Sequence, residues 1–186
     1  MKAISSYLPK EVGMTQDGNK NIVTLFGSKV FSFPKPYNLI KYLISSLNDK
    51  EALILDFFAG SGTTAHATME INSEDLGKRN CITIQIPEIC DKKKDAYKAG
   101  YKTIFDITKA RIEKAAEKIK TDNPDYQGDL GFKIFETVPV PQGYLDEHEI
   151  LNSMAPSLFN GSMLSNDQLD DLLTTWKVYD SAPYYY

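Results

Sequence analysis

The sequence contains few residues that bind metals and no apolar run long enough to cross a membrane. Of its 186 residues only Cys81 and Cys90 are cysteines, and only His66 and His148 are histidines. These four do not stand at the spacings of a metal site or a disulfide framework, so we expect no metal and reduced thiols. No stretch of about 18 apolar residues occurs, and the first residues lack the pattern of a signal peptide. We therefore expect a cytoplasmic protein that does not contact membranes.

A basic surface is also missing from the composition. The formal net charge is -4, whereas domains that bind nucleic acid usually carry an excess of lysine and arginine. The length of 186 residues suits one domain, or one domain with an appendage, and the hydrophobic content of 42% is enough for a core. The composition predicts a globular protein and gives no support for nucleic-acid binding by the chain as a whole.

Residues 54–66 are the stretch in which an apolar strand leads directly into a glycine-rich turn. Residues 53–58 are typical of a strand that is buried on both faces of a parallel sheet, with Asp56 at its end. Gly60 and Gly62 form the turn, and residues 64–71 can be helical, so the first N–H groups of the helix would point into the turn. The second glycine would let a ligand approach the backbone. This order of elements predicts a ligand-binding loop.

The rest of the chain predicts an α/β protein. Residues 81–86 alternate as a second strand, and the short crossover from the first strand makes the two parallel neighbours with a right-handed connection. We further expect helices at residues 37–47, 91–100, 103–120 and around 169–176, a third strand at 131–138, and an extended, proline-stiffened segment at 30–36. Residues 1–30 contain Pro9, Gly13, Gly18 and Gly27 without a sustained period. They predict a loop-rich lead-in.

Three kinds of ligand compete for the glycine-rich turn. A phosphate-binding nucleotidase loop needs a lysine where Thr63 stands, which argues against it. A nicotinamide or flavin fingerprint needs a third glycine where Ala65 stands, and an acid at the end of the second strand, whereas Glu74 and Asp75 precede that strand. A dinucleotide-dependent oxidoreductase therefore stays open as the weaker enzyme alternative.

S-adenosylmethionine fits the residues better. Its binding needs a tight glycine turn beside the methionine part and an acid at the end of the first strand, where Asp56 can meet the ligand's ammonium group. Gln85 or Glu88, at the end of the second strand, is placed to hold the ribose hydroxyls. Each carboxylate also has a purely structural interpretation, Asp56 as a turn or cap residue and Glu88 as an exposed strand end.

Three segments in order, residues 33–40, 56–64 and 77–88, resemble the modification (methyltransferase) subunit of type III restriction-modification systems. Four shorter segments also resemble this family, namely residues 11–16, 99–104, 110–116 and 128–133. The similarity therefore extends over most of residues 10–180. These enzymes are adenine-N6 DNA methyltransferases of the permuted, beta-type order. The resemblance implies a Rossmann-like methyltransferase fold, here only its cofactor-binding half, with a parallel sheet flanked by helices and a carboxy-terminal extension. It divides the chain into residues 1–30, 31–138 and 139–186.

The resemblance also implies the cofactor, the site and the partners. S-adenosylmethionine would be held by Phe33, Lys35, Pro36, Asp56, Phe58, Gly60, Ser61, Gly62, Thr63, Gln85 and Glu88. Gln85 stands where the wider class usually has an acid, so Glu88 is the substitute candidate for the ribose. The implied partners are DNA, a second modification subunit and the restriction subunit, with residues 143–181 as the contact region. Simple packing of that region over the domain is the structural alternative.

The catalytic loop of the family, an Asp-Pro-Pro-Tyr-like tetrapeptide that holds the flipped adenine, does not occur in this sequence. Residues 123–126 are a weak match, and Ser181 with Tyr184 in residues 181–184 is another. In the beta-type order the catalytic loop and the target-recognition region precede the cofactor loop, so the resemblance implies that they precede residue 1. We therefore expect a chain that does not methylate DNA alone, with a non-catalytic assembly module as the alternative.

Overall fold

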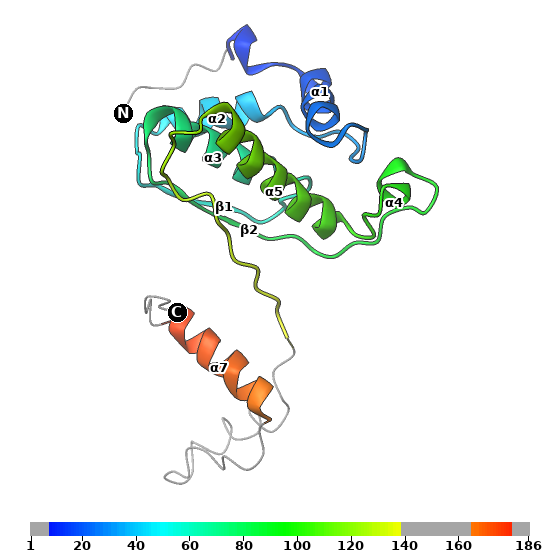
Figure 1. Ribbon diagram of the computed structural model, residues 1–186, viewed down its shortest axis with the longest axis vertical. Helices are drawn as coiled ribbons and strands as arrows, with labels where there is room; N and C mark the ends of the chain where they lie inside the picture. The colour runs from blue at the N-terminus through cyan, green and yellow to red at the C-terminus, as the bar shows by residue number, and fades with distance from the viewer. Residues whose placement is uncertain (1–7, 139–164, 180–186) are drawn as a thin grey trace. The chain divides into compact units, whose positions relative to one another are not determined.

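The computed structural model describes residues 8–138 and 165–179, and the chain divides into two compact units, Met1–Lys133 and Ile134–Tyr186. The described elements of the first unit are η1 (Lys10–Val12), α1 (Thr15–Phe26), α2 (Tyr37–Ser46), β1 (Leu53–Asp56), α3 (Thr63–Asp75), β2 (Asn80–Thr83), α4 (Asp95–Lys98) and α5 (Ile104–Asp122), as Figure 1 shows. In the second unit the described helix is α7 (Asn166–Tyr179). The mixed architecture and the parallel sheet agree with the expected α/β class.

The two strands are parallel neighbours, as the short crossover predicts. Leu53 pairs with Asn80 and Asp56 with Thr83, so the strands are in register over their whole length. Pairing continues past β2, because Ile84 N donates to Asp56 O at 2.8 Å and Ala59 N donates to Ile84 O at 3.1 Å. The carboxyl ends of both strands therefore meet at the glycine turn, which we define as residues 60–63.

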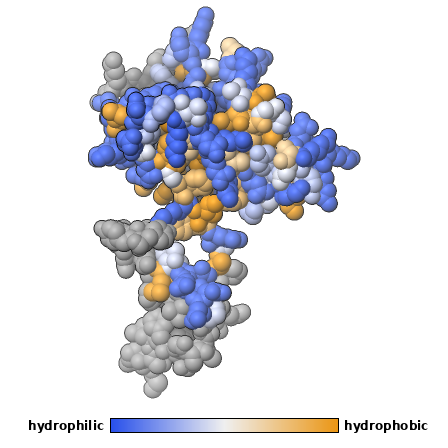
Figure 2. Space-filling model, in the orientation of Figure 1, coloured by the Kyte–Doolittle hydropathy of each residue, from blue (hydrophilic) through white to orange (hydrophobic). Residues whose placement is uncertain are grey.

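Among the described residues, helices cover one face of this strand pair. Ile54 of β1 packs against a buried cluster of Ile44 from α2 and Ala67 and Ile71 from α3. The other face is exposed and carries Leu53, Leu55, Ile82, Ile84 and Ile86. Figure 2 shows hydrophobic residues along the part of the first unit where Figure 1 draws β1 and β2. The prediction that the first strand is buried on both faces is therefore wrong for the described structure.

Residues 15–26, expected as part of a loop-rich lead-in, form helix α1. Asp17 accepts a hydrogen bond from Met14 N at 2.8 Å at the start, and Gly27 ends the helix at φ +75°. Ile22 is fully buried against Val30, Cys90 and Ile107. Gly18 lies inside the helix. A side chain is excluded at this position, because a Cβ atom would stand 2.0 Å from the carbonyl oxygen of Pro34. This glycine serves close packing and does not break the helix.

Other differences from the sequence predictions concern weakly patterned segments. Residues 131–138 form no strand, and the sheet consists of β1 and β2 among the described residues. The helix expected at 91–100 is reduced to α4, whereas α5 and α7 occur where helices were predicted. Residues 176–179, which directly precede the weak catalytic match at 181–184, belong to α7. No helix in the described ranges is both long and apolar enough to cross a membrane.

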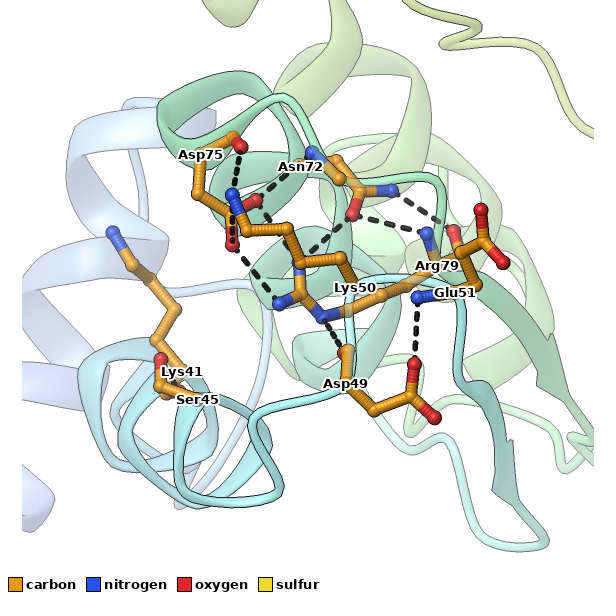
Figure 3. A network of polar contacts seen from close by, with 9 residues as sticks. Lys41, Ser45, Asp49, Lys50, Glu51, Asn72, Asp75 and Arg79 are labelled. Carbon is orange, nitrogen blue, oxygen red and sulfur yellow. Dashed lines mark hydrogen bonds and ion pairs between the residues drawn. The ribbon is translucent and has the colours of Figure 1, made fainter.

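A buried arginine fixes the crossover at the amino ends of the strands (Figure 3). Arg79 donates through Nη1 and Nη2 to the two carboxylate oxygens of Asp75, at 3.0 and 2.9 Å, and through Nε to Asp49 O at 2.8 Å. Asn72 donates to Arg79 O at 2.9 Å. Arg79 is 6% exposed, so its charge is compensated inside the fold. This network holds the end of α3 against the start of both strands, at the edge opposite the glycine turn.

Candidate functional site

Asp56 lies at the carboxyl end of β1, as predicted, with its carboxylate beside the glycine turn. Oδ1 accepts from Phe58 N at 3.0 Å, and Oδ2 accepts from the hydroxyl of Thr64 at 2.5 Å. None of the ion pairs found among the described residues involves this carboxylate. Each oxygen of an ionised carboxylate can accept more than one hydrogen bond. Asp56 is therefore oriented by the turn and still able to accept a bond from a cationic ligand group.

The glycine turn reverses the chain between β1 and α3. Gly60 and Gly62 have φ values of +54° and +76°, a region that favours glycine. Gly62 N donates to Ala59 O at 2.7 Å, and α3 begins directly after it at Thr63. The first N–H groups of an α-helix have no partner within the helix, and they favour negative or polar ligand groups. The turn thus combines a carboxylate and a helix start at one sheet edge.

Gln85 and Glu88, the two candidates for ribose contact, differ in their hydrogen bonding. The Gln85 amide is engaged at both ends, because Oε1 accepts from Gly60 N at 2.7 Å and Nε2 donates to Ile86 O at 2.9 Å. Gln85 therefore ties the turn to the second strand. Glu88 is exposed, and its hydrogen bonds run through the backbone, to Ile86 and Ile104. Of the two, Glu88 has the side chain that is available to a ligand.

The segment 30–36 reaches the glycine turn through a residue that the sequence did not single out. A Cβ atom on Gly60 would lie 3.4 Å from Cζ of Phe31, so this ring stands against the turn. Phe33 has a φ of +58° and is 77% exposed, and Lys35 is exposed, whereas Pro36 is buried at the start of α2. Phe58, on the turn side, is 87% exposed. The structure leaves Phe33, Lys35 and Phe58 accessible and Pro36 enclosed.

Ser61 and Thr63 point into the protein, where Arg111 of α5 binds both. Nη1 of Arg111 donates to Ser61 Oγ and to Thr63 Oγ1, each at 2.8 Å. One helical turn earlier, the hydroxyl of Thr108 donates to Gly60 O at 2.6 Å. Sequence reasoning missed Thr108 and Arg111. The available signal was their position on the buried, otherwise apolar stripe of α5, where an arginine is uncommon.

His66 connects the glycine turn to α2. Its ring stacks on Tyr37, with ring centres 4.9 Å apart, and its Nδ1 accepts from Arg111 Nε at 3.3 Å. Burial, with a contribution from the nearby Arg111 charge, lowers the pKa of His66 to about 3. Burial also lowers the pKa of Arg111, to about 10. At neutral pH a neutral imidazole therefore accepts a hydrogen bond from a charged guanidinium.

Of the two weak matches to a catalytic loop, residues 123–126 follow the last turn of α5, whereas the contacts of α5 with the glycine turn come from Thr108 and Arg111 in its first half. Residues 123–126 form a turn after α5, where Tyr126 N donates to Asn123 O at 3.1 Å. Burial, together with the charges of Asp129 and Asp75, raises the pKa of Tyr126. Ser181 and Tyr184 lie outside the described residues.

The strand-end acid, the glycine turn and the start of α3 lie in a segment that is similar to a known protein family. Residues 5–91 match the DNA methylase family N6_N4_Mtase. This segment contains β1, the glycine turn, α3 and β2. This part of the chain is thus similar to the DNA methylase family.

The chain is similar to modification subunits over most of its length. It is 40% identical over 168 residues to the type III restriction-modification enzyme EcoPI Mod subunit of Escherichia phage P1, covering 90% of this chain and 26% of that protein. It is 45% identical over 136 residues to the StyLTI Mod subunit of Salmonella typhimurium, covering 73% and 21%. Identity to the EcoP15I Mod subunit of Escherichia coli is 40% over 152 residues, covering 82% and 22%. The chain is thus a relative of type III Mod subunits and spans about a quarter of their length or less.

Proposed function

We propose that the chain supplies the S-adenosylmethionine-binding part of a site-specific, adenine-N6 DNA methyltransferase of a type III restriction-modification system. The observation that carries the proposal is the position of Asp56. Its carboxylate is held beside the glycine turn by Phe58 N and the Thr64 hydroxyl, without a cationic partner among the described ion pairs. Within a DNA methylase segment, an oriented carboxylate of this kind suits the ammonium group of the cofactor's methionine part.

Different accessible groups around the turn would bind different parts of the cofactor. Asp56 and the glycine turn would bind the methionine part, with Phe33 and Lys35 beside it. The N–H groups of Gly60 and Gly62 already donate to Gln85 and Ala59, so the turn would offer the backbone N–H groups of Ser61 and Thr63. Glu88 would hold the ribose hydroxyls, because the Gln85 amide is already bonded to Gly60 and Ile86. The side chains of Ser61 and Thr63 are buried against Arg111, so these two residues would contribute through their backbone. Phe58 and Pro36 would shape the walls, the first exposed and the second enclosed.

When bound, the cofactor supplies the methyl group that adenine N6 accepts. The protein's own contribution is orientation, because holding two reacting groups in line can lower a barrier by roughly 7 to 11 kcal/mol. The Asp-Pro-Pro-Tyr-like loop that would hold the adenine does not occur in the 186 residues. We therefore propose that the DNA-binding and catalytic parts lie in protein sequence beyond these residues, and that the chain does not methylate DNA alone. A second modification subunit and the restriction subunit are the proposed protein partners.

A ligand titration of the 186-residue chain tests the cofactor assignment. S-adenosylmethionine and S-adenosylhomocysteine should each raise the melting temperature, whereas NAD should not, because a ligand that binds only the folded state stabilises it. Asp56→Asn should weaken S-adenosylmethionine binding by about 10- to 100-fold, the range for a lost hydrogen bond between charged groups. Asp49→Asn is the matched control, since Asp49 lies at the other edge of the sheet.

Other outcomes of the same titration point to other functions. Stabilisation by NAD alone would replace the proposal with a dinucleotide-dependent oxidoreductase. No response to any of the three ligands would favour a non-catalytic assembly module. Adenine methylation by the purified chain, measured with a radiolabelled methyl donor, would show that the chain contains a complete active centre, contrary to the proposal.

A further inference from the structure

Helix α5 braces the glycine turn from the side that faces the protein interior. Thr108 Oγ1 donates to Gly60 O at 2.6 Å, and Arg111 Nη1 donates to the hydroxyls of Ser61 and Thr63 at 2.8 Å. These contacts join residues 48 and 50 positions apart in the sequence. Three groups of the turn, the backbone carbonyl of Gly60 and the side chains of Ser61 and Thr63, are therefore held by one face of a helix.

The bonding of Arg111 is unusual for a buried arginine. The side chain is 0% exposed, yet its partners are the neutral groups of Ser61, Thr63 and His66. Nη2 has no hydrogen-bond partner in the described structure, and no carboxylate pairs with the guanidinium among the described ion pairs. Burying a charge without an opposite charge is costly. A residue that only filled space at this position could be apolar at lower cost.

Arg79 provides the contrast within the same chain. It is also buried, at 6% exposure, but its guanidinium binds both carboxylate oxygens of Asp75 and the carbonyl of Asp49. Arg79 thus closes a compensated network at the edge of the sheet where no ligand group is proposed. Arg111 instead places its donors under the turn that is proposed to bind the cofactor.

We propose that Arg111 and Thr108 are positioning residues that hold the glycine turn in its ligand-binding conformation before the cofactor arrives. This inference rests on the proposed function of the turn. A turn that is already ordered before the ligand arrives does not have to be ordered by binding, so less binding free energy is lost. Because the turn is assigned to the methionine part, Arg111 acts on that part of the cofactor and not on the adenosine part.

Hydrogen exchange of the ligand-free, 186-residue chain tests the brace directly. In Arg111→Gln, the amides of residues 59–66 should exchange about tenfold or more faster than in the unmodified chain, because a charge-assisted hydrogen bond no longer restrains local opening. Arg79→Gln is the matched control, and its increased exchange should fall at residues 72–80. Unchanged exchange of residues 59–66 in Arg111→Gln would overturn the inference.

Ligand selectivity separates positioning from general stability. Arg111→Gln should bind S-adenosylmethionine and S-adenosylhomocysteine about tenfold more weakly, with little change for 5′-methylthioadenosine, which lacks the amino-acid part. Arg79→Gln should not change the ratio between these ligands. An equal loss for all three ligands in Arg111→Gln would show a merely structural role. If the unmodified chain binds none of them, the proposed function fails, while the exchange experiment still decides whether the brace exists.

Discussion

Gly62 shows how one residue joins the turn to α5. Its φ is +76°, and a Cβ atom there would lie 3.1 Å from Thr108 O and 3.3 Å from Thr108 Cγ2. We expect Gly62→Ala to lower the free energy of unfolding by about 2–4 kcal/mol, from the left-handed backbone together with the displaced helix contact. Gly27→Ala is a close control, because Gly27 has a φ of +75° and nothing within 4 Å of the added atom.

Urea unfolding of the two variants separates these contributions. Gly27→Ala should cost about 1–2 kcal/mol, the cost of the left-handed conformation alone. Equal losses in both variants would mean that α5 yields to the new methyl group, contrary to the close packing described. From the sequence, Gly62 was explained by the close approach of a ligand. The structure adds a second explanation, the close packing of Gly62 against Thr108.

His66 gives the stability of the chain a defined pH dependence. Its pKa is about 3 in the folded protein, whereas an unperturbed histidine titrates near 6.5. As the pH falls below about 6.5 the unfolded chain binds a proton that the folded chain does not, so the free energy of unfolding decreases by up to about 1.4 kcal/mol per pH unit until the folded pKa is reached.

The variant His66→Asn isolates this titration, because an asparagine oxygen can still accept from Arg111 but takes up no proton. Between pH 6.5 and pH 5 the unmodified chain should lose about 2 kcal/mol more than the variant, measured by urea unfolding at each pH. His148 is present in both proteins and cancels in the comparison. Parallel stability curves would show that His66 titrates normally in the folded state.

At the scale of elements, the sequence predicted what local patterns specify. The order of β1, glycine turn, α3 and parallel β2 follows from an apolar run, two glycines and a short crossover, and it is confirmed. Helix α1 was not predicted, because Gly18 reads as a breaker unless the carbonyl of Pro34 beside it is known. Arg111 was missed for the same reason. Its role depends on contacts with residues 45 to 50 positions away, and no local pattern contains them.

The hydrogen-bond network of Arg79, which joins the end of α3 to the start of both strands, should contribute strongly to the free energy of unfolding. Replacement of Arg79 by glutamine leaves Asp75 without its fork-shaped partner, and we expect a loss of about 2–3 kcal/mol at pH 7, the range for breaking a partly buried, charge-assisted pair. The hydrogen bonds from Arg79 hold the pKa of Asp75 below its ordinary value. The stabilisation is thus present above about pH 4 and disappears as the pH falls through the lowered pKa.

Unfolding at pH 7 and at pH 3 measures this effect. The difference between Arg79→Gln and the unmodified chain should be smaller at pH 3, because below the ordinary pKa of aspartate the unfolded chain takes up a proton on Asp75 that the Arg79 hydrogen bonds disfavour in the folded chain. Lys20→Gln, which removes an exposed pair with Asp17 on α1, is the control and should leave stability unchanged at both values. A difference that stays constant with pH would assign the role of Arg79 to its bonds with Asp49 and Asn72 alone.

At the scale of the whole molecule, the described structure leaves an apolar sheet face exposed. The strand sequences predicted burial on both sides, and their composition fits that environment, with leucine and isoleucine on the exposed face as well. The sequence specified the character of both faces, but a pattern of residues cannot specify which other segment covers a face. Which segment covers a face is decided by tertiary contacts. Among the described residues, such contacts are made on the face that α2 and α3 cover.

An exposed apolar face of this kind should bind a hydrophobic dye and promote association. We expect the double variant Leu55→Thr with Ile84→Thr to bind 8-anilinonaphthalene-1-sulfonate less strongly than the unmodified chain. Its unfolding free energy should change by less than about 1 kcal/mol, because both side chains are already about half exposed. Ile71→Thr, on the buried side of α3, is the control and should cost about 2–3 kcal/mol without reducing dye binding. Dye fluorescence that is unchanged in the double variant, or a double variant that is as unstable as Ile71→Thr, would show that this face is covered in solution.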